Sequence, residues 1–169
     1  MDAGELRALQ APIKERYKSE PKAAVITLKA SGTLDDSHIA CKIETGRALA
    51  VAGLHPASGG TGLELCSGDM LLEALVACAG VTLKAVATAL AIPLKSGRVS
   101  AEGDLDFRGT LGVAKEAPVG FVQIRLRIDL DTDAGQDKLD QLLKLTERYC
   151  VVYQTIKSGP PVDVQMARV

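Results

Sequence analysis

Four cysteines, Cys41, Cys66, Cys78 and Cys150, are the residues of this 169-residue sequence with the clearest capacity for chemistry. A thiolate is a nucleophile that can be oxidised and can form a disulfide. Cys78 lies in the almost uncharged stretch LLEALVACAGVTL, and Cys150 lies in LTERYCVVYQTI. Free cysteine is also a common small core residue. Each of these two is therefore either core filler or a reactive thiol, and a disulfide between them requires Cα atoms within about 7 Å.

The other two cysteines have weaker contexts. Cys66, in LCSGD, stands at the expected N-terminus of a helix, which lowers a thiol pKa, whereas the nearby Asp69 carboxylate raises it. Cys66 is either a second reactive thiol or a loop residue whose sulfur packs inward. Cys41 alternates with polar neighbours on an expected strand and is interpreted as filler.

Several function classes are not supported by the sequence. The cysteines lack C-x-x-C spacing, and His38 and His55 have no ligand-spaced partners, so we expect no metal and no cofactor. The formal net charge of −1 gives no general attraction to nucleic acid. Lys84 interrupts the apolar stretch 74–92 and would cost about 3 kcal/mol in a bilayer, so we expect no membrane span. With no signal peptide and few, dispersed cysteines, a cytoplasmic location is expected.

The first half of the chain predicts helix, strands and then a long helix. Residues 4–18 have helical spacing, and Pro12 must start, kink or end that helix. A helix over 67–92, with Ser67 as N-cap and Pro93 as its stop, is apolar nearly all round and is therefore expected to be buried. The expected strands and loops before it are strands 23–30, 38–44 and 47–53, a turn at 31–37 and a glycine-rich loop at 55–62.

The second half predicts two amphipathic strands, a helix and a strand. Residues 98–109 and 122–130 alternate apolar and polar side chains, which is typical of antiparallel strands with one wet face. An amphipathic helix follows over 137–157, and 162–169 is expected as a final strand. Because strands come in runs and do not alternate with helices, the pattern predicts an α+β fold. We expect one domain over 1–169, which begins with a helical segment.

In combination, the two cysteine contexts resemble the OsmC/Ohr family of organic-hydroperoxide reductases and their OsmC-like relatives. The shared pattern is a Gly-rich turn, the helix GDMLLEALVACAGVTLKAVA, two strands, a helix with a late cysteine and a short strand. The resemblance covers about residues 45–165, and it implies that 1–20 is an added N-terminal helical segment. It implies a long buried central helix against antiparallel sheets and an intertwined homodimer with each active site at the subunit interface.

The resemblance also implies a thiol peroxidase with a peroxiredoxin-like, antioxidant activity in the oxidative stress response. Cys78 would be the peroxidatic thiolate, which attacks an organic hydroperoxide and becomes a sulfenic acid. Cys150 would be the resolving thiol, which closes a disulfide that a small dithiol such as dihydrolipoamide then reduces.

The resemblance further implies an arginine and a glutamate that activate the first cysteine. At the glutamate position this chain has Gly68 and Asp69, and Arg47 is the nearest arginine to the expected turn. After the second cysteine the family usually has proline, where this chain has Val151. The alternative to an enzyme is a non-catalytic OsmC-fold protein that binds a small apolar or electrophilic ligand. A third reading is a cysteine-bearing core without a redox role.

Overall fold

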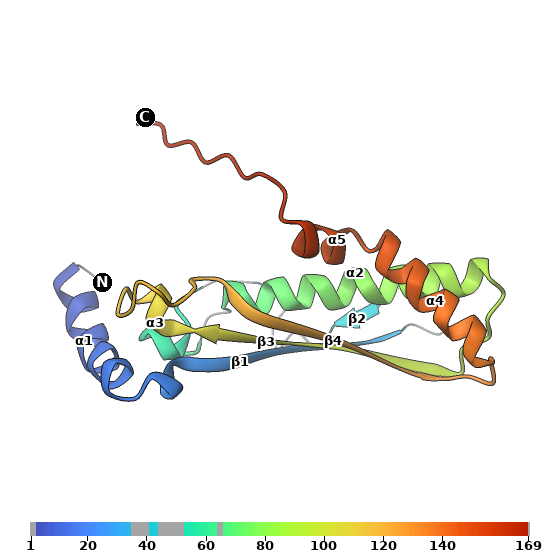
Figure 1. Cartoon of the computed structure of the whole chain (residues 1–169), viewed down its shortest axis with the longest axis horizontal. Coiled ribbons are helices and arrows are strands. Elements are labelled where there is room, and N and C mark those ends of the chain that lie inside the picture. Colours follow the sequence, from blue (N-terminus) through green and yellow to red (C-terminus); the bar gives the residue numbers. More distant parts are fainter. Residues whose placement is uncertain (1–2, 35–40, 44–52, 64–65, 169) are drawn as a thin grey trace.

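The described part of the chain is a four-stranded antiparallel sheet with its longest helix, α2, along one face (Figure 1). The computed structural model describes residues 3–34, 41–43, 53–63 and 66–168. The strand order is β2-β1-β3-β4, and the fold is α+β, as the sequence predicts. The elements are α1 (Ala3–Ser19), η1 (Pro21–Ala24), β1 (Val25–Leu34), β2 (Cys41–Ile43), η2 (Pro56–Ser58), α2 (Ser67–Ala89), β3 (Ser96–Asp106), α3 (Phe107–Thr110), β4 (Phe121–Asp131), α4 (Gln136–Tyr149) and α5 (Val151–Ser158).

Strand β3 is an inner strand of the sheet. Its residues pair with β1 on one side and with β4 on the other, and a register shift at Asp104/Leu105 bends the β3–β4 pair. Val99, Ala101 and Gly103 are buried on the face towards α2. The strand ends at Asp106, three residues before the expected end, because the Asp106 carboxylate accepts a hydrogen bond from the Arg108 amide and begins α3.

The apolar face of β4 is less buried than its alternation predicts. It consists of Val122, Ile124, Leu126, Ile128 and Leu130, which are half-buried except for the exposed Val122. The physical reason is position, because β4 is an edge strand of the described sheet and part of this face borders a cavity.

Helix α2 forms the core of the fold with β3 and the last two helices. Its fully buried side chains pack with Val99, Leu142 and Cys150. Figure 1 shows α4 and α5 on the same side of the sheet as α2. The length and apolar composition of α2 would allow it to cross a membrane, but core helices share both properties. Its buried residues are Leu72, Leu75, Val76, Ala79, Gly80, Leu83 and Ala87.

The ends of α2 differ slightly from expectation. Cys66, and not Ser67, is the N-cap residue, and it makes no side-chain capping bond. The helix ends at Ala89, before Pro93, because Ala91 adopts a left-handed conformation with φ 50° and the Ile92 amide bonds back to the Ala87 carbonyl.

Two predictions for the C-terminal part were wrong. The helix expected over 137–157 is two helices, since Cys150 has an extended ψ of 105° and separates α4 from α5. The expected strand 162–169 is absent from the described residues 159–168, which extend away from the rest of the chain (Figure 1). A strand requires a hydrogen-bonded neighbour, and this segment has none within the described chain.

The early part of the chain agrees in outline with the predictions. Helix α1 continues through Pro12, and its Tyr17 hydroxyl donates to the Ala57 carbonyl at 2.7 Å. Strand β1 runs to Leu34, so it includes half of the expected turn 31–37. The expected strand 47–53 lies almost entirely outside the described residues.

The close approach of the Phe121 ring to β3 requires glycine at position 103. A Cβ at Gly103 would overlap the Phe121 ring, whereas a Cβ at Gly120 would meet nothing within 4 Å. We expect Gly103→Ala to lower the free energy of unfolding by about 1–3 kcal/mol, because the ring must move out of the core. Gly120→Ala is the matched control in urea unfolding, and equal effects of the two substitutions would contradict this packing role.

Candidate thiol site

Cys78 and Cys150 come together where α2 contacts the junction of α4 and α5. Cys78 is half-buried in the middle of α2, and Cys150 is 1% exposed. Their side chains are within hydrogen-bonding contact, and both are free thiols. The sequence could place each cysteine on a helix but could not give this contact.

The break between α4 and α5 depends on Cys150 itself. Its amide donates to the Thr146 carbonyl at 2.9 Å and closes α4. Its sulfur accepts the Tyr153 amide at 3.5 Å and thereby caps the start of α5. One residue is therefore the C-cap of one helix and the N-cap of the next, which directs the free amides of the first turn of α5 towards α2.

Hydrogen bonds make Cys78 more acidic than an ordinary thiol. Burial raises the pKa of Cys78, but donors outweigh it and the net pKa is lowered. Among the described residues, these donors are the Val152 amide, the Cys150 thiol, the Thr82 hydroxyl and the Val151 amide. The sulfur at this position is therefore stabilised as a thiolate.

Cys150 shifts in the opposite direction. Burial and the adjacent Cys78 sulfur together raise the pKa of Cys150 to about 11, although the Tyr153 and Val152 amides oppose this shift. Two adjacent sulfurs do not both ionise easily, and the opposite pKa shifts make Cys78 the sulfur that loses its proton first. The pair thus combines a thiol that ionises more readily than usual with a thiol that retains its proton.

The other predicted site residues do not join this pair. Cys66 and Asp69 lie in or before the first turn of α2, at an axial rise of about 18 and 14 Å from Cys78. Burial raises the pKa of Asp69, and the nearby His55 opposes this only in part. Sequence spacing did not reveal that His55 and Asp69 lie close together. Arg47 lies outside the described residues, and of Cys41 only the backbone, in β2, is described.

Sequence reasoning missed the donors Thr82, Val151 and Val152. Thr82 had a visible signal, because it lies four residues after Cys78 and so on the same face of the helix. The two valines act through main-chain amides, which side-chain patterns do not reveal.

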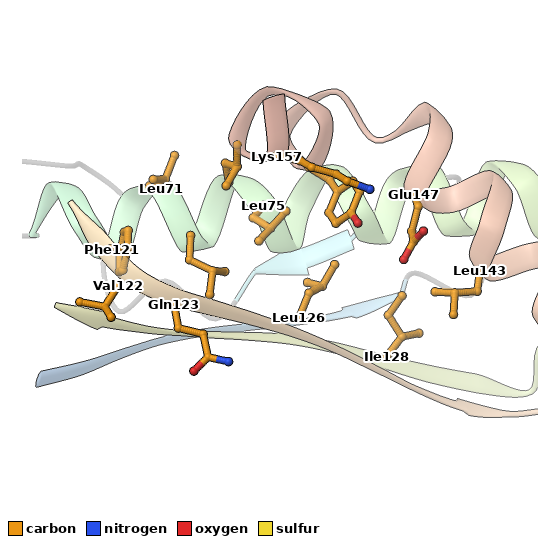
Figure 2. A pocket seen from close by; sticks show the side chains of 13 residues that line it. Leu71, Leu75, Phe121, Val122, Gln123, Leu126, Ile128, Leu143, Glu147 and Lys157 are labelled. Carbon is orange, nitrogen blue, oxygen red and sulfur yellow. The ribbon is translucent and has the colours of Figure 1, made fainter. Parts of the chain in front are cut away.

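An apolar cavity of about 780 Å³ lies between α2, β4, α4 and α5, and its lining includes neighbours of both cysteines but neither cysteine itself. Figure 2 shows Leu75 of α2 on one wall and Leu126 of β4 facing it, with Glu147 and Lys157 at the helical side. Leu75 lies nearly one helical turn before Cys78. Tyr153 also lines the cavity, and its amide donates a hydrogen bond to the Cys150 sulfur. The cavity can therefore hold an apolar group about one helical turn from each cysteine.

No metal site accompanies the thiols in the described ranges. Within them, no group of three or more His, Cys, Asp or Glu side chains is placed to hold a metal ion. His55 is engaged locally, since its Nδ1 accepts the Ala57 amide at 3.0 Å and its ring stacks on Phe107 at 5.0 Å.

The Thr82 hydroxyl provides a direct test of the thiolate environment. Thr82→Val removes a donor without changing the shape of the side chain, so the Cys78 pKa should rise by up to about one unit. The measurement is the alkylation rate of Cys78 against pH, followed by mass spectrometry of its peptide. Thr82→Ser keeps a hydroxyl and should retain the wild-type midpoint, and a Thr82→Val midpoint equal to it would contradict the assignment.

Comparison with known proteins places this architecture in a family. The chain resembles the crystal structure of an OsmC-like hydroperoxide resistance protein from Jannaschia sp. CCS1, with a TM-score of 0.62 and 13% sequence identity. The match covers 86% of this chain and 95% of that one. None of the curated proteins matches the sequence. The sequence model of the OsmC-like protein family matches residues 60–165, and the chain therefore belongs to the OsmC-like family.

Proposed function

We propose that the protein reduces organic hydroperoxides through the thiol pair Cys78 and Cys150. The observation that carries the proposal is the contact between two sulfurs with opposite pKa shifts, one favouring thiolate and the other thiol. Membership of the OsmC-like family and the similarity to a hydroperoxide resistance protein support a peroxide-related activity.

The first step consumes the hydroperoxide. The Cys78 thiolate attacks the distal oxygen of R–O–O–H, a sulfur–oxygen bond forms and the oxygen–oxygen bond breaks. The alkoxide leaves, takes a proton and becomes an alcohol. Cys78 is oxidised to a sulfenic acid, and the hydroperoxide is reduced by two electrons.

The second stage restores the thiols. The Cys150 sulfur attacks the sulfenic sulfur, a disulfide forms and water leaves with the Cys150 proton. A small dithiol, such as dihydrolipoamide, then reduces the disulfide to two thiols and is itself oxidised to a cyclic disulfide. Because Cys150 is already in contact with Cys78, resolution requires little rearrangement.

The cavity supports an organic substrate. Its lining is mainly Leu, Ile, Val and Phe side chains, which favour an alkyl or aryl group over water. The same cavity also supports the second candidate function, non-catalytic binding of an apolar ligand. That alternative predicts saturable binding of an apolar fluorescent probe, competed by long-chain alcohols, in a protein that does not consume hydroperoxide.

Substitution of the cysteines distinguishes the two functions. We expect Cys78→Ser to reduce turnover of an aryl hydroperoxide, with dihydrolipoamide as reductant, to the uncatalysed level. Cys150→Ser should still consume one equivalent of hydroperoxide and then accumulate the Cys78 sulfenic acid, which a dimedone probe traps. Cys66→Ser is the matched control, because it removes a thiol that lies remote from the pair and should keep wild-type turnover. An inert wild-type protein would refute the peroxidase.

We also propose that the chain forms a homodimer. Residues 159–168 are extended and exposed, with Val162, Val164 and Met166 alternating along one side, and Val164 is 88% exposed. Such a segment favours pairing with a strand edge and burial of its apolar side chains. The exposed Val122 of edge strand β4 adds apolar surface that a second copy would cover.

Charge placed on the apolar side of this segment should weaken the dimer. We expect Val164→Lys to shift the sedimentation of the full chain from dimer towards monomer, because a buried lysine opposes association. Asp163→Lys introduces the same side chain on the opposite side of an extended segment and is the control. A monomeric wild-type chain, or equal effects of the two substitutions, would contradict the dimer.

A further inference from the structure

Each main-chain amide in the first turn of α5 has a sulfur as its hydrogen-bond acceptor, and two of these amides lie beside Cys78. The first three residues of a helix have N–H groups without intrahelical acceptors. In α5 the Tyr153 amide donates to the Cys150 sulfur at 3.5 Å, the Val151 amide lies beside Cys78, and the Val152 amide is shared between the two sulfurs. The next amide, from Gln154, makes the regular helical bond to the Cys150 carbonyl at 2.9 Å.

This arrangement follows from the helix break and does not require a basic side chain. Cys150 is extended, so α5 starts afresh with its positive end beside α2. Helices α2 and α5 are in contact, and the Cys78 sulfur lies half-buried between them. A negative charge at this position receives both hydrogen bonds and the helix dipole.

We propose that the N-terminus of α5, through the Val151 and Val152 main-chain amides, holds Cys78 in its reactive thiolate form. Val151 is thus a positioning residue that acts through its backbone, and its side chain, 70% exposed, is not needed. The inference rests on the proposed peroxidase function for its purpose but concerns the ionisation of Cys78 alone.

Proline at position 151 removes one of these donors with little other change. Proline lacks an N–H and is favoured at the first position of a helix. The residue before a proline must be extended, and Cys150 already is, with φ −72° and ψ 105°. Val151→Ala removes the same side chain but keeps the amide, so it is the matched control.

The test is the pH dependence of Cys78 alkylation in the reduced full-length protein. We expect Val151→Pro to raise the midpoint by about half a unit, which lowers the thiolate fraction below the midpoint about threefold. Val151→Ala should keep the wild-type midpoint. Equal midpoints for the proline and alanine variants would overturn the proposal.

A second measurement needs no change in α5. In ¹⁵N–¹H spectra of the wild-type chain, the Val151 and Val152 amide shifts should titrate with the Cys78 midpoint, and Cys78→Ser should abolish that titration. Amide chemical shifts that do not change around the Cys78 midpoint would overturn the proposal, even if the proline variant did not fold. Titrating amides in a protein inert towards hydroperoxides would uphold this inference while refuting the peroxidase.

Discussion

The thiol site depends on how the half-buried sulfur of Cys78 can accommodate a negative charge. Cys78 lies in the helix that forms the core, where loss of water disfavours the thiolate. Hydrogen-bond donors replace that water, and two of the four in the described chain come from the helix α5, which starts beside the sulfur. The core helix therefore fixes the position of the thiol, and the start of α5 fixes its charge.

The same junction divides the roles of the two cysteines. Cys150 ends α4, caps α5 and is almost fully buried, so its proton is retained and its sulfur stays in contact with Cys78. A fully helical segment through position 150 would place no free amides at Cys78. The break in the helix thus supplies the contact, the donors and the difference in acidity together.

The sequence predicted the elements better than their junctions. The mainly apolar pattern of 67–89 and the alternation of β3 and β4 follow from burial, which side-chain periodicity records directly. The break at Cys150 left no such record, since LTERYCVVYQTI contains neither proline nor glycine and its helical spacing continues across the break. The final strand was mispredicted because its alternation is real but its pairing partner is not in the described chain.

The junction of α4 and α5 gives a physical explanation for the differences between this chain and the family pattern. An arginine–glutamate pair would stabilise a thiolate through charge, whereas amides stabilise it through dipoles and hydrogen bonds, which salt screens less. A proline after the second cysteine would leave that position without a donor, and Val151 provides one. Two of the four donors to Cys78 among the described residues are main-chain amides, so a search for side-chain motifs alone misses half of these groups that lower its pKa.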